Sequence, residues 1–210
     1  MVWEPFANKR GMLKGSLVEL APLRPCHAAD LFEAGRDPEI WRYMPIAGFD
    51  SLAAVEGWIA EAQEAEEAGR ELPFAIIELS TGRAVGSTRY LDIRREERAL
   101  EIGWTWLAPA AQRTGLNRES KFLLLRHAFE TLGQLRVAFF TDAENGRSRS
   151  ALVRLGATYE GTLRLHRARE RNGFARNSAA YSVIARDWPS VKVRLELSLK
   201  RHARLSRNVP

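Results

Sequence analysis

The 210-residue chain has one cysteine, Cys26, and no apolar run that approaches 18 residues. A single cysteine cannot form an internal disulfide or a cysteine-rich metal site, and it fits a reducing cytoplasm. No transmembrane helix is predicted, and residues 1–20 lack the apolar centre of a signal peptide. The four histidines have no ligand-like spacing, so we expect no metal site. These absences predict a soluble, cytoplasmic protein with no membrane partner.

Two nucleotide-binding motifs are also missing. Neither G-x-G-x-x-G nor G-x-x-x-x-G-K occurs, which disfavours a dinucleotide-binding fold and a P-loop. The composition itself is that of an ordinary globular protein, with 45% apolar and 28% charged residues. No internal repeat or Gly/Ser-rich linker divides the chain, so it is expected to form one domain with a sizeable core.

The formal net charge is +6, and 27 of the 32 basic residues are arginine because only five are lysine. Arginine binds phosphate and carboxylate groups in a bidentate manner, so the excess indicates either an anionic partner or an arginine-rich solvated surface. The charge is uneven along the chain. Six Glu and one Arg lie in 52–71, five Arg and one Glu in 161–176, and six Lys or Arg and one Glu in 192–207.

The spacing of apolar residues predicts alternating strands and helices. Strands are predicted at 17–20, 74–79, 84–91, 100–107, 136–140, 158–165 and 179–184. Helices are predicted at 26–36, from a cap at Asp50 or Ser51 to Gly69, at 115–132 and at 148–155. The strand–helix–strand unit from 100 to 140 should be a right-handed parallel crossover in a mixed sheet. Hairpin turns are predicted at Thr81-Gly82, between the strands 74–79 and 84–91, and at Asn172-Gly173.

The chain after Trp188 fits two conformations. Apolar residues alternate from 191 to 199 as on a strand, but three of them also lie four apart as on a helix. Pro189 suits a first helical turn, so we prefer the helix. We therefore divide the chain into an N-terminal extension (1–14), a main domain (15–188) and a basic C-terminal segment (189–210).

The most informative segment lies between the strand 100–107 and the helix that follows it, and it reads Gln112-Arg113-Thr114-Gly115-Leu116-Asn117. A strand that ends in such a turn and enters a helix directs several unpaired backbone N–H groups at one point. The helix dipole adds positive potential there. Gly115 permits a positive φ or the close approach of a ligand. By itself the turn fits an anion site or an ordinary connection.

With its surroundings, the turn resembles the GNAT superfamily of N-acetyltransferases. The resemblance rests on Gln-x-x-Gly after a strand, a long amphipathic helix, a strand ending at Thr141-Asp142, then Asn145-Gly146-Arg147-Ser148 and Leu155-Gly156-Ala157. It covers residues 15–188, and the pattern is similar to the branch of RimJ/RimL-type ribosomal-protein Nα-acetyltransferases. Asn117 departs from the superfamily pattern, which has Gly or Ala at that position of the turn.

The resemblance implies an α/β fold with a mixed, largely antiparallel sheet of about six to seven strands, flanked by helices. It also implies acetyl-CoA as cosubstrate, with its pyrophosphate on the turn and its pantetheine arm between strands that splay apart at Leu107 and Phe140. Residues 41–45 would form one wall of the acceptor site. The implied cofactor-binding residues are Trp106, Leu107, Gln112, Arg113, Thr114, Gly115, Leu116, Asn117 and Asn145. Asn145 fits a helix cap equally well.

Acetyl transfer to an amine needs a base that removes the amine's proton, and Glu101 is the candidate. Strict alternation along 100–107 would place Glu101, Gly103 and Thr105 on one face, with the tryptophans on the other. Small neighbours would then leave room for a ligand beside the carboxylate. The alternative is a solvent-exposed glutamate.

Ser148 is the candidate for the proton donor. Many members of the superfamily place a tyrosine where this chain has Leu152. The RimL-like branch instead has a serine after the asparagine, and Ser148 takes that place. Ser148 fits a catalytic acid or a helix cap.

The predicted function is therefore acetyl-CoA-dependent N-acetylation of a primary amine, with a protein or peptide N-terminus, such as that of a ribosomal protein, as the first acceptor class. A small amine, such as an antibiotic, a polyamine or an amino acid, is the alternative enzyme substrate. A nucleic-acid-binding module that uses the basic hairpin and tail is the third and weakest interpretation. Exposed strands and the apolar tail also suggest a homodimer.

Overall fold

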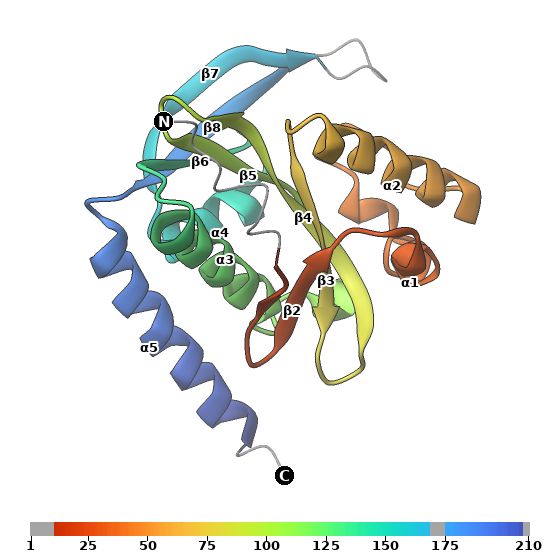
Figure 1. Cartoon of the computed structure of the whole chain (residues 1–210), viewed down its shortest axis with the longest axis horizontal. Helices are drawn as coiled ribbons and strands as arrows, with labels where there is room; N and C mark the ends of the chain where they lie inside the picture. The colour runs from red at the N-terminus through yellow and green to blue at the C-terminus, as the bar shows by residue number, and fades with distance from the viewer. Residues whose placement is uncertain (1–10, 169–174, 208–210) are drawn as a thin grey trace.

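The structure is a computed structural model that describes residues 11–168 and 175–207 (Figure 1). One sheet of eight strands runs through the described part in the order β1-β2-β3-β4-β5-β6-β8-β7. All neighbouring strands are antiparallel except β5 and β6, which are parallel. Their bounds are β1 Leu13–Lys14, β2 Val18–Pro22, β3 Leu72–Glu78, β4 Arg83–Arg94, β5 Ala99–Leu107, β6 Arg136–Asp142, β7 Thr158–Ala168 and β8 Ala175–Ile184. The predicted mixed sheet is confirmed, with the short β1 as the additional strand.

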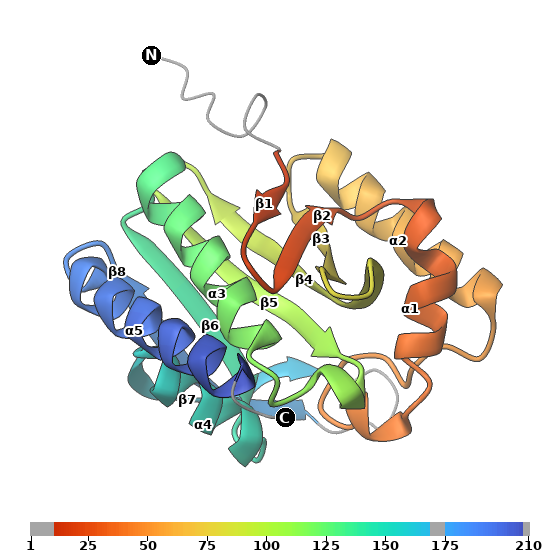
Figure 2. The same cartoon turned by 90° about the horizontal axis from the view of Figure 1, so that it is seen from below.

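The helices cover both faces of the sheet (Figures 1 and 2). The helices α1 (Ala28–Ala34) and α2 (Leu52–Glu67) enclose a core that contains Trp41, Trp58 and Trp106. The other face packs against α3 (Leu116–Arg126), α4 (Gly146–Leu155) and α5 (Trp188–Arg207). The C-terminal segment is thus a helix, as preferred from Pro189. The predicted turn at Asn172-Gly173 lies outside the described residues.

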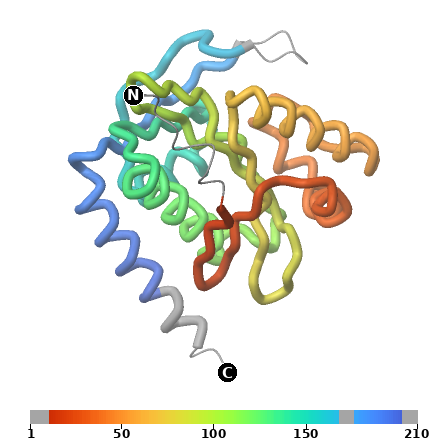
Figure 3. The backbone as a smooth tube through the Cα atoms, in the orientation of Figure 1, coloured from red at the N-terminus to blue at the C-terminus, as the bar shows by residue number. Residues whose placement is uncertain are grey.

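The parallel crossover runs from β5 through α3 to β6 (Figure 3). After Arg126 the helix continues as a π-helical turn, His127–Thr131. The hydroxyl of Tyr90 on β4 donates a 2.6 Å hydrogen bond to the Leu124 carbonyl in the preceding turn. A buried phenol needs such a partner, and here it ties β4 to the C-terminal half of α3.

The buried carboxylate of Glu119 holds the first turn of α3 in place. Glu119 accepts hydrogen bonds from the Ser16 amide (2.9 Å), the Ser16 hydroxyl (2.6 Å), the Leu17 amide (2.6 Å) and the Val18 amide (2.8 Å). A Cβ at Gly15 would lie 2.5 Å from the carboxyl group, so this position has no room for a side chain. Charge-assisted bonds of this kind are the strong ones, and they hold the first turn of α3 against the β1–β2 turn.

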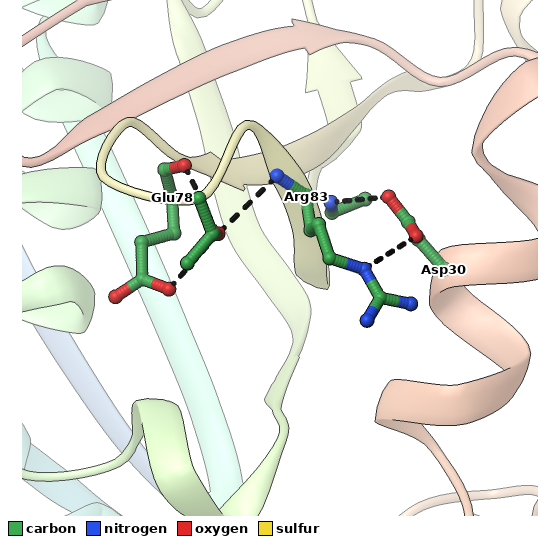
Figure 4. A network of polar contacts seen from close by, with 5 residues as sticks. Asp30, Glu78 and Arg83 are labelled. Carbon is green, nitrogen blue, oxygen red and sulfur yellow. Dashed lines mark hydrogen bonds and ion pairs between the residues drawn. The ribbon is translucent and has the colours of Figure 1, made fainter.

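On the opposite face, Asp30 joins α1 to the start of β4 (Figure 4). Its carboxylate accepts 2.9 Å hydrogen bonds from the Arg83 Nε and from the Ala84 amide. Burial opposes ionisation of Asp30, but these two donors outweigh it and lower its pKa. Close by, the Thr81 hydroxyl lies between Glu78 and the Arg83 amide, and it closes the predicted β3–β4 turn.

The strict alternation predicted for β5 is wrong beyond Gly103. Gly103 pairs with Arg89 and Trp106 pairs with Ser87, so Trp104 and Thr105 together face a single residue of β4. This is a β-bulge, and Trp104 has a φ of +50°. Because of the bulge, Trp106 packs in the α1–α2 core, whereas Leu100 and Ile102 pack in the α3 core.

Candidate active site

A cavity opens where β5 and β6 separate. Their parallel pairing covers only three positions and ends at Glu101 and Ala138. Beyond it, β5 continues to Leu107 with its other edge on β4, and β6 continues to Asp142 with its other edge on β8. The facing edges are therefore unpaired, as the splayed strands in the prediction require. The cavity has a volume of about 430 Å³.

One end of the cavity is the turn before α3. Gly115 is the N-cap of α3 and has a φ of +94°, in the left-handed region that favours glycine. Backbone N–H groups at the start of this helix have no intrahelical partner, so they are available to an anion. The cavity wall at this end carries Arg113 and Arg118 beside the turn, and Arg147 of α4, which contacts Gln112; Arg154 of α4 also lines the cavity.

Gln112 takes a structural role at this end. Its side-chain amide donates to the Leu107 carbonyl at 3.0 Å, and its oxygen accepts a 2.8 Å bond from Arg147. The residue thus connects the end of β5 with the start of α4. Of the predicted cofactor residues, Trp106, Leu107, Gln112, Arg113, Gly115, Asn117 and Asn145 line the cavity. Thr114 and Leu116 do not line it: the Thr114 hydroxyl donates to the Ala111 carbonyl at 2.7 Å, and Leu116 packs in the core.

The helix α4 forms another part of the cavity wall, and its N-terminal cap is Asn145. The Asn145 side-chain oxygen accepts a 3.0 Å hydrogen bond from the Ser148 amide, so Asn145 caps α4. The alternative that Ser148 is the cap is wrong, since Ser148 supplies the amide that is capped. Both residues line the cavity, with Ser148 half-buried. A catalytic role for Ser148 stays a prediction.

Glu101 lines the cavity at the last position of β5 that pairs with β6. Its side chain is only 3% exposed, so the alternative of a solvent-exposed glutamate is wrong. Arg167 of β7 donates a 3.0 Å hydrogen bond to its carboxylate. Burial raises the pKa of Glu101 above its ordinary value, although Arg167 and Arg176 counteract part of this effect. The predicted base is thus desolvated and held by a residue of the basic hairpin.

Two functional candidates were missed from the sequence. Arg167 entered only as part of a basic segment, because nothing local indicates a partner 66 residues away. Lys121 lies four residues before Leu125 on the apolar stripe of α3, a position where a lysine is unusual. It is 7% exposed and lines the cavity. Burial lowers its pKa from 10.5 to about 7.

The cavity is also lined by the segment between α1 and α2 and by the strands β7 and β8. Tyr43, Met44 and Pro45 line it from one side, which places part of the predicted 41–45 wall on the cavity. Arg167 and Arg176 line it from the other. Within the described part of the chain, no helix is long and apolar enough to cross a membrane. Among these same residues, no cluster of three or more His, Cys, Asp or Glu side chains could hold a metal ion.

Comparison with known families identifies this architecture. Residues 18–158 match the family described as "Acetyltransferase (GNAT) domain". The chain belongs to the GNAT acetyltransferase family. Members of this family transfer the acetyl group of acetyl-CoA to an amine, so the protein is an N-acetyltransferase. A comparison with curated proteins gives no match.

Solved structures support the assignment. A GCN5-related N-acetyltransferase from Brucella melitensis is 28% identical, with a TM-score of 0.85 over 91% of this chain and 86% of its own. A protein from T. thermophilus, also assigned to the acetyltransferases, is 33% identical, with a TM-score of 0.81 over 90% and 96% of the two chains. Mycobacterium smegmatis RimJ, in complex with CoA-disulfide, shares the fold at 24% identity, with a TM-score of 0.76 over 90% and 93%.

The GNAT site in this chain fits acetyl-CoA. A phosphate-bearing molecule requires cations and free N–H groups, and Arg113, Arg118 and Arg147 together with the first turn of α3 supply both at one end. An extended arm requires an unpaired strand edge, and β5 supplies one from Gly103 to Leu107. The electrophile that the bound cosubstrate supplies is a thioester carbonyl.

Proposed function

We propose that this GNAT enzyme acetylates the α-amine of a protein or peptide N-terminus. The proposal is carried by the charge of the cavity wall. Glu101 is the single acidic side chain among the described residues that line it, and it already pairs with Arg167. A polyamine or an aminoglycoside carries several cations, which would meet Arg167 and Arg176 without further carboxylates to pair with. An acceptor with one amine fits this wall better.

Two of the solved structures that share this fold have names that point to the same acceptor class. Besides RimJ, the structures that share this fold include a Vibrio cholerae protein assigned as a ribosomal-protein-serine acetyltransferase, at 19% identity and a TM-score of 0.72. An N-terminus is also an extended chain. The opening between the 43–45 wall and the β7–β8 hairpin would accept one from outside, with its amine directed at Glu101.

Each group of cavity residues would then have its own role in acetyl transfer. The turn at Gly115 and the arginines of α3 and α4 would hold the phosphates, and the free edge of β5 would orient the arm. Glu101 would accept the proton of the amine, and its raised pKa brings its basicity closer to neutral pH. The hydrogen bond from Arg167 would hold the Glu101 carboxylate in place at the cavity.

The test is an acceptor comparison at a fixed acetyl-CoA concentration. One peptide has a free N-terminus and an internal lysine, a second is the same peptide with a blocked N-terminus, and spermidine is the third acceptor. CoA release and mass spectrometry report the product. We expect acetylation at the free α-amine only. Equal acetylation of the blocked peptide, or acetylation of spermidine alone, would refute the proposed acceptor class.

A further inference from the structure

Lys121 is a buried cation on the cavity wall that the proposed mechanism does not use. Its ammonium group donates hydrogen bonds to the hydroxyls of Thr105 and, at 3.3 Å, Thr88. Throughout residues 11–168 and 175–207, no carboxylate forms an ion pair with it. An apolar side chain of similar length would be cheaper to bury at a purely structural position. A lysine here therefore calls for an anion that is absent from the protein itself.

The β5 bulge places this lysine opposite Glu101. Leu100 and Ile102 pack against α3, so Glu101 between them points to the other face, where Arg167 meets it. The bulge reverses the alternation, and Thr105 instead faces α3, where Lys121 reaches its hydroxyl. A carboxylate and an ammonium group thus lie on opposite faces of the same strand. Both line the same cavity.

Transfer from a thioester creates two proton requirements. The amine nitrogen forms the C–N bond and must lose a proton, and the C–S bond breaks with its electron pair leaving on sulfur as a thiolate. The proton from nitrogen goes to Glu101 and then to solvent. We propose that the Lys121 ammonium group stabilises the departing CoA thiolate from the α3 side and protonates it, and that solvent then restores its proton. This inference rests on the proposed transfer from acetyl-CoA.

The protonation equilibrium of Lys121 suits this role. Its pKa of about 7 means that the ammonium and amine forms are both populated at neutral pH. A group that must give up a proton and recover it in each cycle works best when its pKa lies near the operating pH. The cause of the lowered pKa is burial, with no basic neighbour involved. A thiolate nearby would raise it again, because an opposite charge favours the charged form.

The direct test measures the thiol of bound CoA. Thiolate absorbance in the ultraviolet is followed against pH for CoA bound to the wild type, to Lys121→Met and to Lys192→Met. Lys192 lies on α5, outside the cavity, where it pairs with Glu130 at 2.8 Å, so its substitution is a control that makes the same chemical change away from the cavity. We expect the thiol to titrate at least about one pH unit lower in the wild type and in Lys192→Met than in Lys121→Met. Equal titration in all three would overturn the inference.

A second measurement needs only the wild-type protein. The Lys121 amine is titrated by NMR in complexes with CoA and with desulfo-CoA, which lacks the sulfur. A higher pKa of Lys121 in the CoA complex supports the pairing, and identical values contradict it. Calorimetry of CoA binding distinguishes failure of the proposed function from failure of the proposed role of Lys121. If the wild type does not bind CoA, the proposed function fails; if CoA binds and acetylation proceeds but the thiol and lysine titrations are unchanged, only the role of Lys121 fails.

Discussion

Replacing Lys121 with methionine should stabilise the folded protein at pH 7. Burial lowers the pKa of Lys121 from 10.5 to about 7. At about 1.4 kcal/mol for each pKa unit, this difference corresponds to a burial cost of about 5 kcal/mol. The substitution also removes the hydrogen bonds to Thr88 and Thr105, at about 1 kcal/mol each. Methionine fills a similar volume without a charge, so we expect a net gain of about 3 kcal/mol in the free energy of unfolding.

This gain should depend on pH in a defined direction. The pKa of Lys121 is lower in the folded than in the unfolded chain, so between pH 7 and 10.5 the unfolded chain binds more protons. The free energy of unfolding of the wild type therefore rises with pH in this window, by about 1.4 kcal/mol per pH unit from this residue. Lys121→Met lacks this contribution. Its advantage should decline from about 3 kcal/mol at pH 7 to near zero at about pH 9.

Chemical denaturation at pH 7, 8 and 9 measures this for the wild type, Lys121→Met and the control Lys192→Met, which removes a lysine outside the cavity. The difference between the wild type and Lys121→Met cancels the titration of all other groups. The reasoning is refuted if the two pH profiles run parallel, or if Lys121→Met is less stable than the wild type at pH 7. A more stable but slower variant would indicate that Lys121 is retained for function at a cost in stability.

Three further outcomes are expected. Glu101→Gln should lower kcat roughly 10²–10⁴-fold while leaving CoA affinity nearly intact, and the wild-type rate should fall as pH drops through the raised pKa of Glu101. An unchanged kcat of this variant with a verified acceptor would mean that Glu101 is not the base. Gly115→Asp should weaken CoA binding in calorimetry at least about tenfold relative to the control Gly115→Asn, in which asparagine tolerates the same positive φ without the charge. Equal affinities of the two variants would argue against a pyrophosphate at this turn. Glu119→Gln should destabilise the fold by about 3 kcal/mol in denaturant titrations, because four donors lose a charged acceptor; an unchanged midpoint would show that these bonds add little.

Most of the fold could be predicted from the sequence because the elements follow local patterns. Apolar periodicity located every strand except β1 and the helices α1 to α4, whereas for α5 it fitted strand and helix and Pro189 favoured the helix. The cap at Ser51 and the C-cap Gly156 act on their own turns. The handedness of strand–helix–strand units made the parallel crossover predictable. The two-residue β1 was missed because it is too short to show a period, and it exists only through its pairing with β2.

The candidate site was predictable where a residue type and its backbone conformation coincide. Gly115 lies at a positive φ at the start of α3, and Asn145 caps α4, both as their residue types favour. The sequence alone thus determined the turn and the strand that carries Glu101, and it left the cap open between Asn145 and Ser148. It could not determine which way the second half of that strand faces, because a bulge is decided by pairing with β4 and reverses the alternation within one residue.

The tertiary structure decided the electrostatics of the site. Glu101 is a strong candidate base because long-range packing buries it against Arg167, and no local pattern reports a partner 66 residues away. The position of Lys121 on the apolar side of α3 is visible in the sequence, but its lowered pKa is not, because the bulge places Thr105 next to the lysine and the surrounding core excludes water. Desolvation depends on everything that surrounds a group in space, whereas sequence patterns record only its neighbours along the chain. The shifted pKa values of Glu101 and Lys121 therefore follow from the tertiary structure and not from the sequence pattern.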